Sequence, residues 1–262
     1  MSFKRIISRI DVKGDNLVKG INLEGLKILG KPWDFSKYYY EKKVDEIIFF
    51  DTVASLYGRN NLLDIVEKVS KNVFIPITVG GGVRSISDIK KLLKVGADKV
   101  VINTKALQDP SFINSASDMF GSSTILVNIN FNIQPDKSYS CFIENGRQIV
   151  DKDIFKWIDE VQKRGAGELI LTSINTDGTG KGYDLNFYKK IKDKVKIPLT
   201  LSGGFGNIDH VYNLIKNEDV DAIAIASMFH YNKIKDKTFN GQLLSPVELK
   251  KKLIKKNIKC RL

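Results

Sequence analysis

The sequence predicts a single α/β domain over residues 1–262, a (β/α)8 TIM barrel with an internal half-barrel repeat. Eight short runs rich in β-branched residues alternate with stretches of helical period, which is typical of parallel strands joined by helices. The chain also nearly repeats itself, because residues 79–83 and 97–104 recur at one constant spacing as residues 202–205 and 220–227. A duplicated half-barrel leaves this kind of repeat.

The elements follow in order along the chain. Strands are predicted at residues 5–11, 45–51, 75–79, 98–103, 124–130, 168–173, 198–202 and 221–226. Helices fit between them, and residues 60–70 and 86–95 each place branched aliphatic side chains on one face. Gly96 and Gly165 mark helix ends, which leaves short connections to the strands that follow.

Two segments interrupt this rhythm, and both follow the carboxyl end of a strand, where barrels of this kind keep their active sites. Residues 13–34 hold four glycines and Pro32, so we expect a long loop that acts as an active-site lid. Residues 132–150 predict a hairpin inserted after the fifth strand, because Asn145 and Gly146 suit the positive φ of a tight turn.

Composition narrows the functional class. The formal charge is +12 and the pI about 9.4, but the lysines are scattered over helical faces and no nucleic-acid-binding motif accompanies them. We therefore expect a solvated basic surface that favours phosphorylated small molecules, with no nucleic-acid partner. Two cysteines and two histidines are too few for a disulfide framework or a zinc site. We expect no metal, no cofactor, no membrane segment and a cytoplasmic location.

Glycine runs and hydroxyl residues predict two anion sites. Residues 80–82 and 202–204 follow the third and seventh strands, while residues 103–104 and 226–227 end the fourth and eighth. Glycine lets backbone N–H groups approach an anion closely, and a helix N-terminus adds favourable partial charge. The two copies at matched spacing predict a ligand with a phosphate at each end.

Acidic residues at strand ends are the candidates for proton transfer. Asp11 and Asp51 follow the first and second strands, and Asp177 lies in the loop after the sixth. Asp11 ranks first, because the alternation along its strand points it into the barrel mouth. Asn130 ends the fifth strand, where the half-barrel symmetry predicts an acid. An amide orients a ligand but exchanges no proton near neutral pH.

Four charges of balanced sign lie at strand starts, at the opposite end of the barrel: Arg5, Glu46, Lys99 and Glu168. The common interpretation of such residues is an exposed rim that contributes little stability. The alternative is a salt-bridged ring around the barrel axis, which a small neutral molecule passes.

Together these residues resemble the HisF family, the cyclase subunit of imidazole glycerol phosphate synthase, from residue 4 to about residue 231. The similarity is carried by residues 4–7 with 11–13, 18–20, 78–82, 96–100 with 102–104, 163–168, 171–174 with 177–179, and 202–204. The resemblance implies a lyase-type subunit of a glutamine amidotransferase. Such a barrel docks a HisH-like glutaminase, takes ammonia along its axis and joins it to a bis-phosphorylated ribulosyl substrate.

The resemblance also implies roles for individual residues. Asp11 falls on a catalytic acid/base, Lys19 on the substrate-contacting lid, and Asp98 on the glutaminase interface, while Asp51 is assigned to substrate binding. The ammonia gate falls on Arg5, Glu46, Lys99 and Glu168. The phosphate-binding positions fall on Gly82, Asn103, Thr104, Gly178, Gly204, Ala226 and Ser227.

Asn130 departs from the family, which has its second catalytic aspartate there. Residues 53–64 and 177–184 are similar to a HisF-like branch associated with glycosyl amidation, in which that aspartate is not retained. Three hypotheses follow. The favoured one is an ammonia-handling subunit that works with a glutaminase and a sugar amidotransferase to amidate an N-acetyl sugar of surface glycans. The second is a true cyclase of histidine biosynthesis, with Asp177 or Asp51 transferring protons. The third is a non-catalytic barrel that activates its glutaminase.

Overall fold

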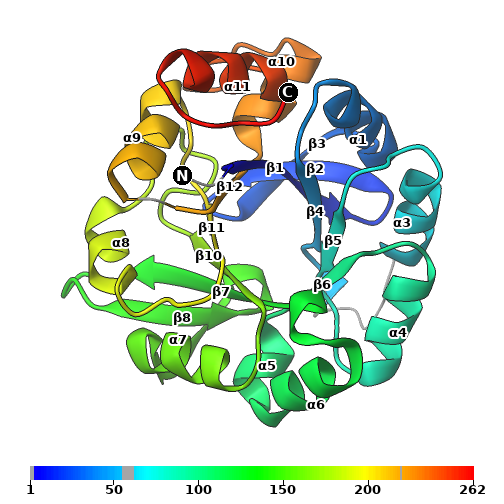
Figure 1. Ribbon diagram of the computed structural model, residues 1–262, viewed down its shortest axis with the longest axis vertical. Coiled ribbons are helices and arrows are strands. Elements are labelled where there is room, and N and C mark those ends of the chain that lie inside the picture. The colour runs from blue at the N-terminus through cyan, green and yellow to red at the C-terminus, as the bar shows by residue number, and fades with distance from the viewer. Residues whose placement is uncertain (1–2, 55–61, 219) are drawn as a thin grey trace.

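The computed structural model describes residues 3–54, 62–218 and 220–262. Eight parallel strands form a closed barrel surrounded by helices, seen down the barrel in Figure 1. The barrel strands are β1 (Arg5–Lys13), β4 (Glu46–Asp51), β5 (Ile77–Gly80), β6 (Lys99–Ile102), β7 (Ile125–Ile133), β10 (Glu168–Ser173), β11 (Leu199–Ser202) and β12 (Ala222–Ile225). Pairing of β7 with β10 closes the ring, which confirms the predicted (β/α)8 barrel.

Helices cover the outside of the barrel. They are α1 (Pro32–Glu41), α3 (Leu62–Ser70), α4 (Ile86–Lys94), α5 (Thr104–Gln108), α6 (Ser111–Phe120), α7 (Ile154–Lys163), α8 (Leu185–Ile191), α9 (Ile208–Glu218), α10 (Ser227–Ile234) and α11 (Pro246–Lys255). Two 3₁₀ turns lie at η1 (Ser122–Thr124) and η2 (Glu144–Gly146). The predicted helix at 60–70 is α3, although residues 55–61, which include much of the 53–64 motif, lie outside the described residues. Within the described ranges, no helix is long and apolar enough to cross a membrane.

The segment at 13–34 is a β hairpin rather than the long loop expected from its glycines. Strand β2 (Asn16–Ile21) runs antiparallel to β1, and β3 (Glu24–Gly30) pairs with β2. Gly14 adopts positive φ at the turn between β1 and β2, where glycine permits the reversal. The turn between β2 and β3 is made by Asn22 and Leu23, both with positive φ, whereas Gly25 lies within β3. The segment predicted as a long lid loop is therefore an ordered hairpin followed by the start of α1, and its role as a lid stays a prediction.

A second hairpin follows the fifth barrel strand. Strand β7 continues to Ile133 and is followed by β8 (Tyr139–Ile143) and β9 (Gln148–Asp153). Strand β8 pairs antiparallel with β7, and β9 pairs antiparallel with β8. Asn145 and Gly146 have φ of 57° and 86°, the conformation for which these residue types are suited. This arrangement extends one side of the barrel beyond the mouth.

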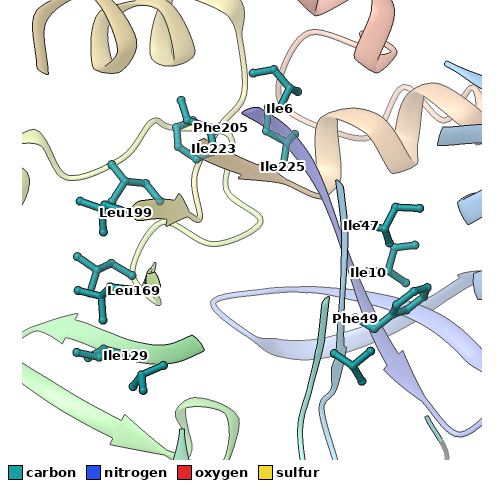
Figure 2. Close-up of a cluster of buried hydrophobic side chains, with 14 of the residues drawn as sticks. Ile6, Ile10, Ile47, Phe49, Ile129, Leu169, Leu199, Phe205, Ile223 and Ile225 are labelled. Carbon is teal, nitrogen blue, oxygen red and sulfur yellow. The ribbon is translucent and has the colours of Figure 1, made fainter. Parts of the chain in front are cut away.

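Alternation along the strands separates an outer core from an inner one. Residues that point outward, such as Ile10, Ile47 and Leu169, pack under the helices, as Figure 2 shows. A smaller cluster fills the middle of the barrel interior: Ile7, Ile48, Phe50, Val101, Leu126, Ile170, Ala222 and Ala224. Since Ile7 lies two residues after Arg5 and two before Arg9, polar layers lie on both sides of this apolar layer.

Candidate functional site

Two cavities lie at the carboxyl ends of the strands, and each contains one of the predicted anion sites. The open cavity has a volume of about 170 Å³ and its lining includes Asp51, Gly82, Asn103, Thr104 and Asn130. The smaller cavity has a volume of only about 10 Å³, and its lining includes Lys19, Asp177, Gly178, Gly204, Ala226 and Ser227. A volume near 10 Å³ holds a single water molecule, so only the first cavity admits a ligand in this conformation.

Glycine is required at corresponding positions of the two cavities. Gly81 has a φ of 100°, and a Cβ there would lie 2.5 Å from the Asp51 carbonyl oxygen. Gly204 has a φ of 90°, and a Cβ there would lie 2.2 Å from the Gly182 carbonyl oxygen. Both positions therefore combine a left-handed backbone with a close approach to another segment, which only glycine tolerates. The sequence repeat thus reflects repeated backbone geometry.

A buried cluster of four charges separates the two cavities. Arg9 Nε donates to Asp11 Oδ1 at 2.8 Å, and Lys19 Nζ donates to Asp11 Oδ2 at 3.3 Å. Lys19 also donates to Asp177 Oδ1, and Asp177 Oδ2 lies 3.9 Å from Arg9 Nη1. All four side chains are at most 3% exposed, so the two cations and two carboxylates balance each other away from water.

This cluster defines the chemical state of Asp11. Burial alone would raise its pKa, but the charges of Arg9 and Lys19 outweigh that effect and lower it. Asp11 is therefore an ionised carboxylate with both oxygens already engaged. It lines neither cavity, so in this conformation a ligand in the open cavity does not reach it.

The hairpin of β2 and β3 contributes Lys19 to the wall of the smaller cavity. Lys19 lies on β2 and is buried rather than carried on an exposed lid. At the hairpin tip, Asn22 N donates to the Asp177 carbonyl oxygen at 2.8 Å, and its side chain donates to two carbonyl oxygens of the loop after β10. A ligand larger than a water molecule therefore needs more space at this wall than the present conformation provides.

Asp51 and Glu144 are the two described carboxyl residues that line the open cavity, and Asp51 is the one on a barrel strand. Its Oδ1 accepts from Val53 N at 2.9 Å, whereas its buried Oδ2 has no partner among the described residues. Burial raises the pKa of Asp51 above its ordinary value, and backbone hydrogen bonds from Val53 and Ala54 only partly oppose this. Asp51 is thus the cavity-lining acid best suited to carry a proton. The side-chain Oδ1 and Nδ2 of Asn103 are also buried, and neither has a hydrogen-bond partner among the described residues.

Asn130 lies where the sequence analysis placed it, at the open mouth on β7, and is 4% exposed. Its Oδ1 accepts from Asn128 Nδ2 at 2.8 Å, and Asn128 Oδ1 accepts from the Thr172 hydroxyl at 2.9 Å. Since Asp11 belongs to the buried ion cluster, the two residues do not face one shared ligand space in this structure.

At the other end of the barrel, the four predicted charges form one ring. Arg5 donates to Glu46 at 3.1 Å and to Glu168 at 2.8 Å. Lys99 Nζ donates to the same two carboxylates at 3.1 and 3.5 Å. Each glutamate also accepts a hydroxyl hydrogen bond, Glu46 from Thr78 and Glu168 from Thr200, and both pairs span 32 residues. The ring is thus a salt-bridged network, not an exposed rim.

Asp98 has a structural partner. Its Oδ2 accepts from Ile77 N at 2.8 Å, and its repeat counterpart Asp221 accepts in the same way from Leu199 N at 3.0 Å. Both carboxylates therefore bond the backbone of the preceding barrel strand. The geometry gives Asp98 a role in the fold, and its role in a partner interface stays a prediction.

Sequence reasoning missed Arg9, Asn128 and His230. The alternation along β1 pointed to Arg9, but its partners on β10 and β11 are distant in sequence. His230 is buried and its Nδ1 bonds the Tyr39 hydroxyl, while its Nε2 has no partner among the described residues. Burial, with a smaller contribution from the Lys19 charge, lowers the pKa of His230 to about 3.

This pKa predicts that acid destabilises the fold through His230. Between the ordinary pKa of 6.5 and about 3, the unfolded chain binds a proton that the folded chain does not, so stability falls as pH falls. At pH 5 the penalty is about 2 kcal/mol. We expect His230→Gln to reduce the difference in unfolding free energy between pH 7 and pH 5 by about that amount, measured by urea titration.

The half-buried His210 is the matched control, because its pKa is also lowered by burial but it is less enclosed. His210→Gln should change the same pH difference less. An equal effect of the two variants would contradict the assignment to His230.

The described residues contain no group of three or more His, Cys, Asp or Glu side chains arranged to hold a metal ion. Cys141 and Cys260 are both buried, and burial raises the pKa of their thiols to about 12 and about 11. Neither thiol is therefore a nucleophile near neutral pH.

Comparison with known proteins agrees with this geometry. Residues 5–235 match the family model described as histidine biosynthesis protein. The chain is 46% identical over 209 residues to the imidazole glycerol phosphate synthase subunit HisF of Legionella pneumophila, which covers 80% of this chain and 99% of that protein. It is 41% identical over 237 residues to the HisF subunit of Trichormus variabilis and 42% identical over 233 residues to that of Bacillus cereus, each covering 89% of this chain and 92% of the relative. The chain therefore belongs to the histidine biosynthesis protein family, among its HisF subunits.

Proposed function

We propose that this chain is the ammonia-using cyclase subunit of an imidazole glycerol phosphate synthase, working with a HisH-like glutaminase. The single observation that carries this proposal is the arrangement along the barrel: two matched anion sites at the mouth, and a charged ring at the floor. The names of the relatives support the histidine-pathway reading. In this reading, one phosphate of the substrate binds in each cavity.

Ammonia would enter through the ring of Arg5, Glu46, Lys99 and Glu168 and cross the apolar middle layer. A neutral molecule is not held by that layer, whereas ions are excluded by its low polarity. The ammonia nitrogen then adds to the ketone carbon of the ribulosyl group, and the oxygen leaves as water after protonation. Asp51 is the group we assign to that proton transfer, because it lines the open cavity and its buried Oδ2 has no hydrogen-bond partner among the described residues.

The test is rescue of a histidine auxotroph that lacks its own cyclase. Growth without histidine supports the proposal, and the Asp51→Asn variant is the matched negative control. Failure to grow, with the protein present and folded, would overturn it.

A second candidate is amidation of an N-acetyl sugar, which Asn130 favours. An amide at the fifth strand forfeits the roughly 10²- to 10⁴-fold that a general acid or base supplies, so cyclisation there lacks one proton carrier. In that case the auxotroph is not rescued. Asn130→Asp should then gain cyclase activity with ammonium salts, since the rest of the site is present.

A third outcome, stimulation of the glutaminase that survives Asp11→Asn, would indicate a barrel that activates its partner without chemistry of its own.

The floor ring predicts a specific coupling defect. Removal of the Lys99 ammonium group opens the ring on one side. Both glutamates stay paired, because Arg5 still bonds each of them. We expect Lys99→Ala to lower the yield of product per glutamine hydrolysed while turnover with added ammonium salt stays normal. Coupling that stays at the level of the unmodified chain would contradict an ammonia path along this axis.

A further inference from the structure

Arg9 occupies the barrel axis between the apolar middle layer and the mouth. It is 2% exposed, and its guanidinium lies 4.8 Å from the ring centre of Phe50. Nη1 donates to Thr172 Oγ1 at 3.3 Å and to Ser202 Oγ at 3.1 Å, in addition to the Nε bond to Asp11. Arg9 therefore connects the ion cluster to the polar side chains of β10 and β11.

The hydrogen bonds that start at Arg9 have only one possible direction. A guanidinium donates and never accepts, so Thr172 Oγ1 accepts from Arg9 and must give its own proton elsewhere. That proton goes to Asn128 Oδ1, which leaves Asn128 Nδ2 to donate to Asn130 Oδ1. The reverse orientation of Asn128 would leave a fully buried hydroxyl proton without an acceptor, which is costly.

The end of this chain of hydrogen bonds is the Asn130 Nδ2 group. Its oxygen is taken by Asn128, and among the described residues no acceptor contacts Nδ2. Asn130 and Arg9 both line the open cavity. The two amide protons are thus presented to whatever occupies that cavity.

We propose that Arg9 is a positioning residue which, through Thr172 and Asn128, fixes the Asn130 amide as a hydrogen-bond donor toward the ligand. The open cavity then selects a ligand with an acceptor at this point, such as a carbonyl, carboxamide or phosphate oxygen. A ligand that must donate there is excluded, because two donors would face each other. This inference rests on the proposed function only for the identity of the ligand.

The experiment exchanges Thr172 while leaving Arg9 and Asn130 in place. The full chain is labelled with ¹⁵N-asparagine, and the side-chain amide resonances of Asn130 are assigned by their loss in Asn130→Asp. Thr172→Val has the same shape but no hydroxyl, whereas Thr172→Ser keeps the hydroxyl. We expect Thr172→Val to shift or split the Asn130 amide signals, and Thr172→Ser to leave them as in the unmodified chain. Inorganic phosphate, titrated as the probe, should bind at least threefold more weakly to Thr172→Val only.

Ser202→Ala is the matched control, because it removes another acceptor of the same Arg9 Nη1 that lies outside the path to Asn130. It should leave the Asn130 signals unchanged. Asn128→Ala serves as a second break in the path, and should move the Asn130 signals whether or not Thr172→Val folds. Equal behaviour of the Val and Ser variants, or no response to Asn128→Ala, would overturn the proposal. The resonances report side-chain orientation regardless of turnover, so a failed auxotroph rescue leaves this test intact.

Discussion

Asp51→Asn should lower synthase turnover by roughly 10²- to 10⁴-fold, the range that a positioned general acid supplies. Asn at this position keeps the shape of the side chain and the Oδ1 acceptor for Val53 N, so the fold is expected to persist. What is lost is the proton that the carboxyl group carries, since Asp51 lines the open cavity and its Oδ2 has no partner among the described residues. The measurement is turnover of the bis-phosphorylated substrate with ammonium salt, which removes any contribution from the glutaminase.

The pH dependence of the same reaction separates proton transfer from binding. Burial raises the pKa of Asp51, so its protonated form persists to higher pH than that of an ordinary aspartate. Turnover that depends on this proton falls as pH rises through that pKa, and Asp51→Asn should lack this fall. Asp209→Asn, at an exposed ion pair with Lys256, is the control for replacing a carboxyl by an amide. If Asp51→Asn kept its turnover within threefold of that of the unmodified chain, Asp51 would be excluded as the acid.

Most of the barrel follows from local sequence patterns. Strand positions were predictable because short branched aliphatic runs alternate with helical patterns, and each observed barrel strand overlaps its predicted range. The hairpin of β2 and β3 was not predictable, because its turn is made by Asn22 and Leu23, while Gly25 lies within β3 rather than at a turn. Pairing depends on contacts with β1 and with the loop after β10, which no local pattern contains.

The candidate site also has features that the sequence predicts and features that it does not. The anion sites were predictable from a repeat of glycines and hydroxyls, and the floor charges from their position at strand starts. The partners that define their chemistry were not, because Thr172, Asn128 and Ser202 come from different strands than Arg9. Asp11 likewise reads as a free acid in sequence, and only the structure places both its oxygens in ion pairs.

Removal of Glu168 should destabilise the fold by about 1–3 kcal/mol, the usual cost of leaving a buried polar group without its partner. Glu168 is 8% exposed at its side chain and accepts from Arg5, Lys99 and Thr200. Glu168→Ala leaves the Arg5 charge with one carboxylate instead of two, and the buried Thr200 hydroxyl without its acceptor. The measurement is the free energy of unfolding in urea at pH 7.

The loss of stability in Glu168→Ala should also depend on pH. Burial would raise the pKa of Glu168, but its hydrogen bonds and attraction to Arg5 outweigh burial and lower it from 4.5. A lowered folded-state pKa adds stability that is present above pH 4.5 and is lost as pH falls through the folded pKa. The difference between the unmodified chain and Glu168→Ala should therefore shrink below pH 4.5. Glu160→Ala is the matched control, because its ion pairs with Lys152 and Arg164 are about 29% exposed and contribute about 1 kcal/mol or less. If the two variants lost equal stability, the burial of Glu168 within the floor ring would contribute no more than a partly exposed ion pair.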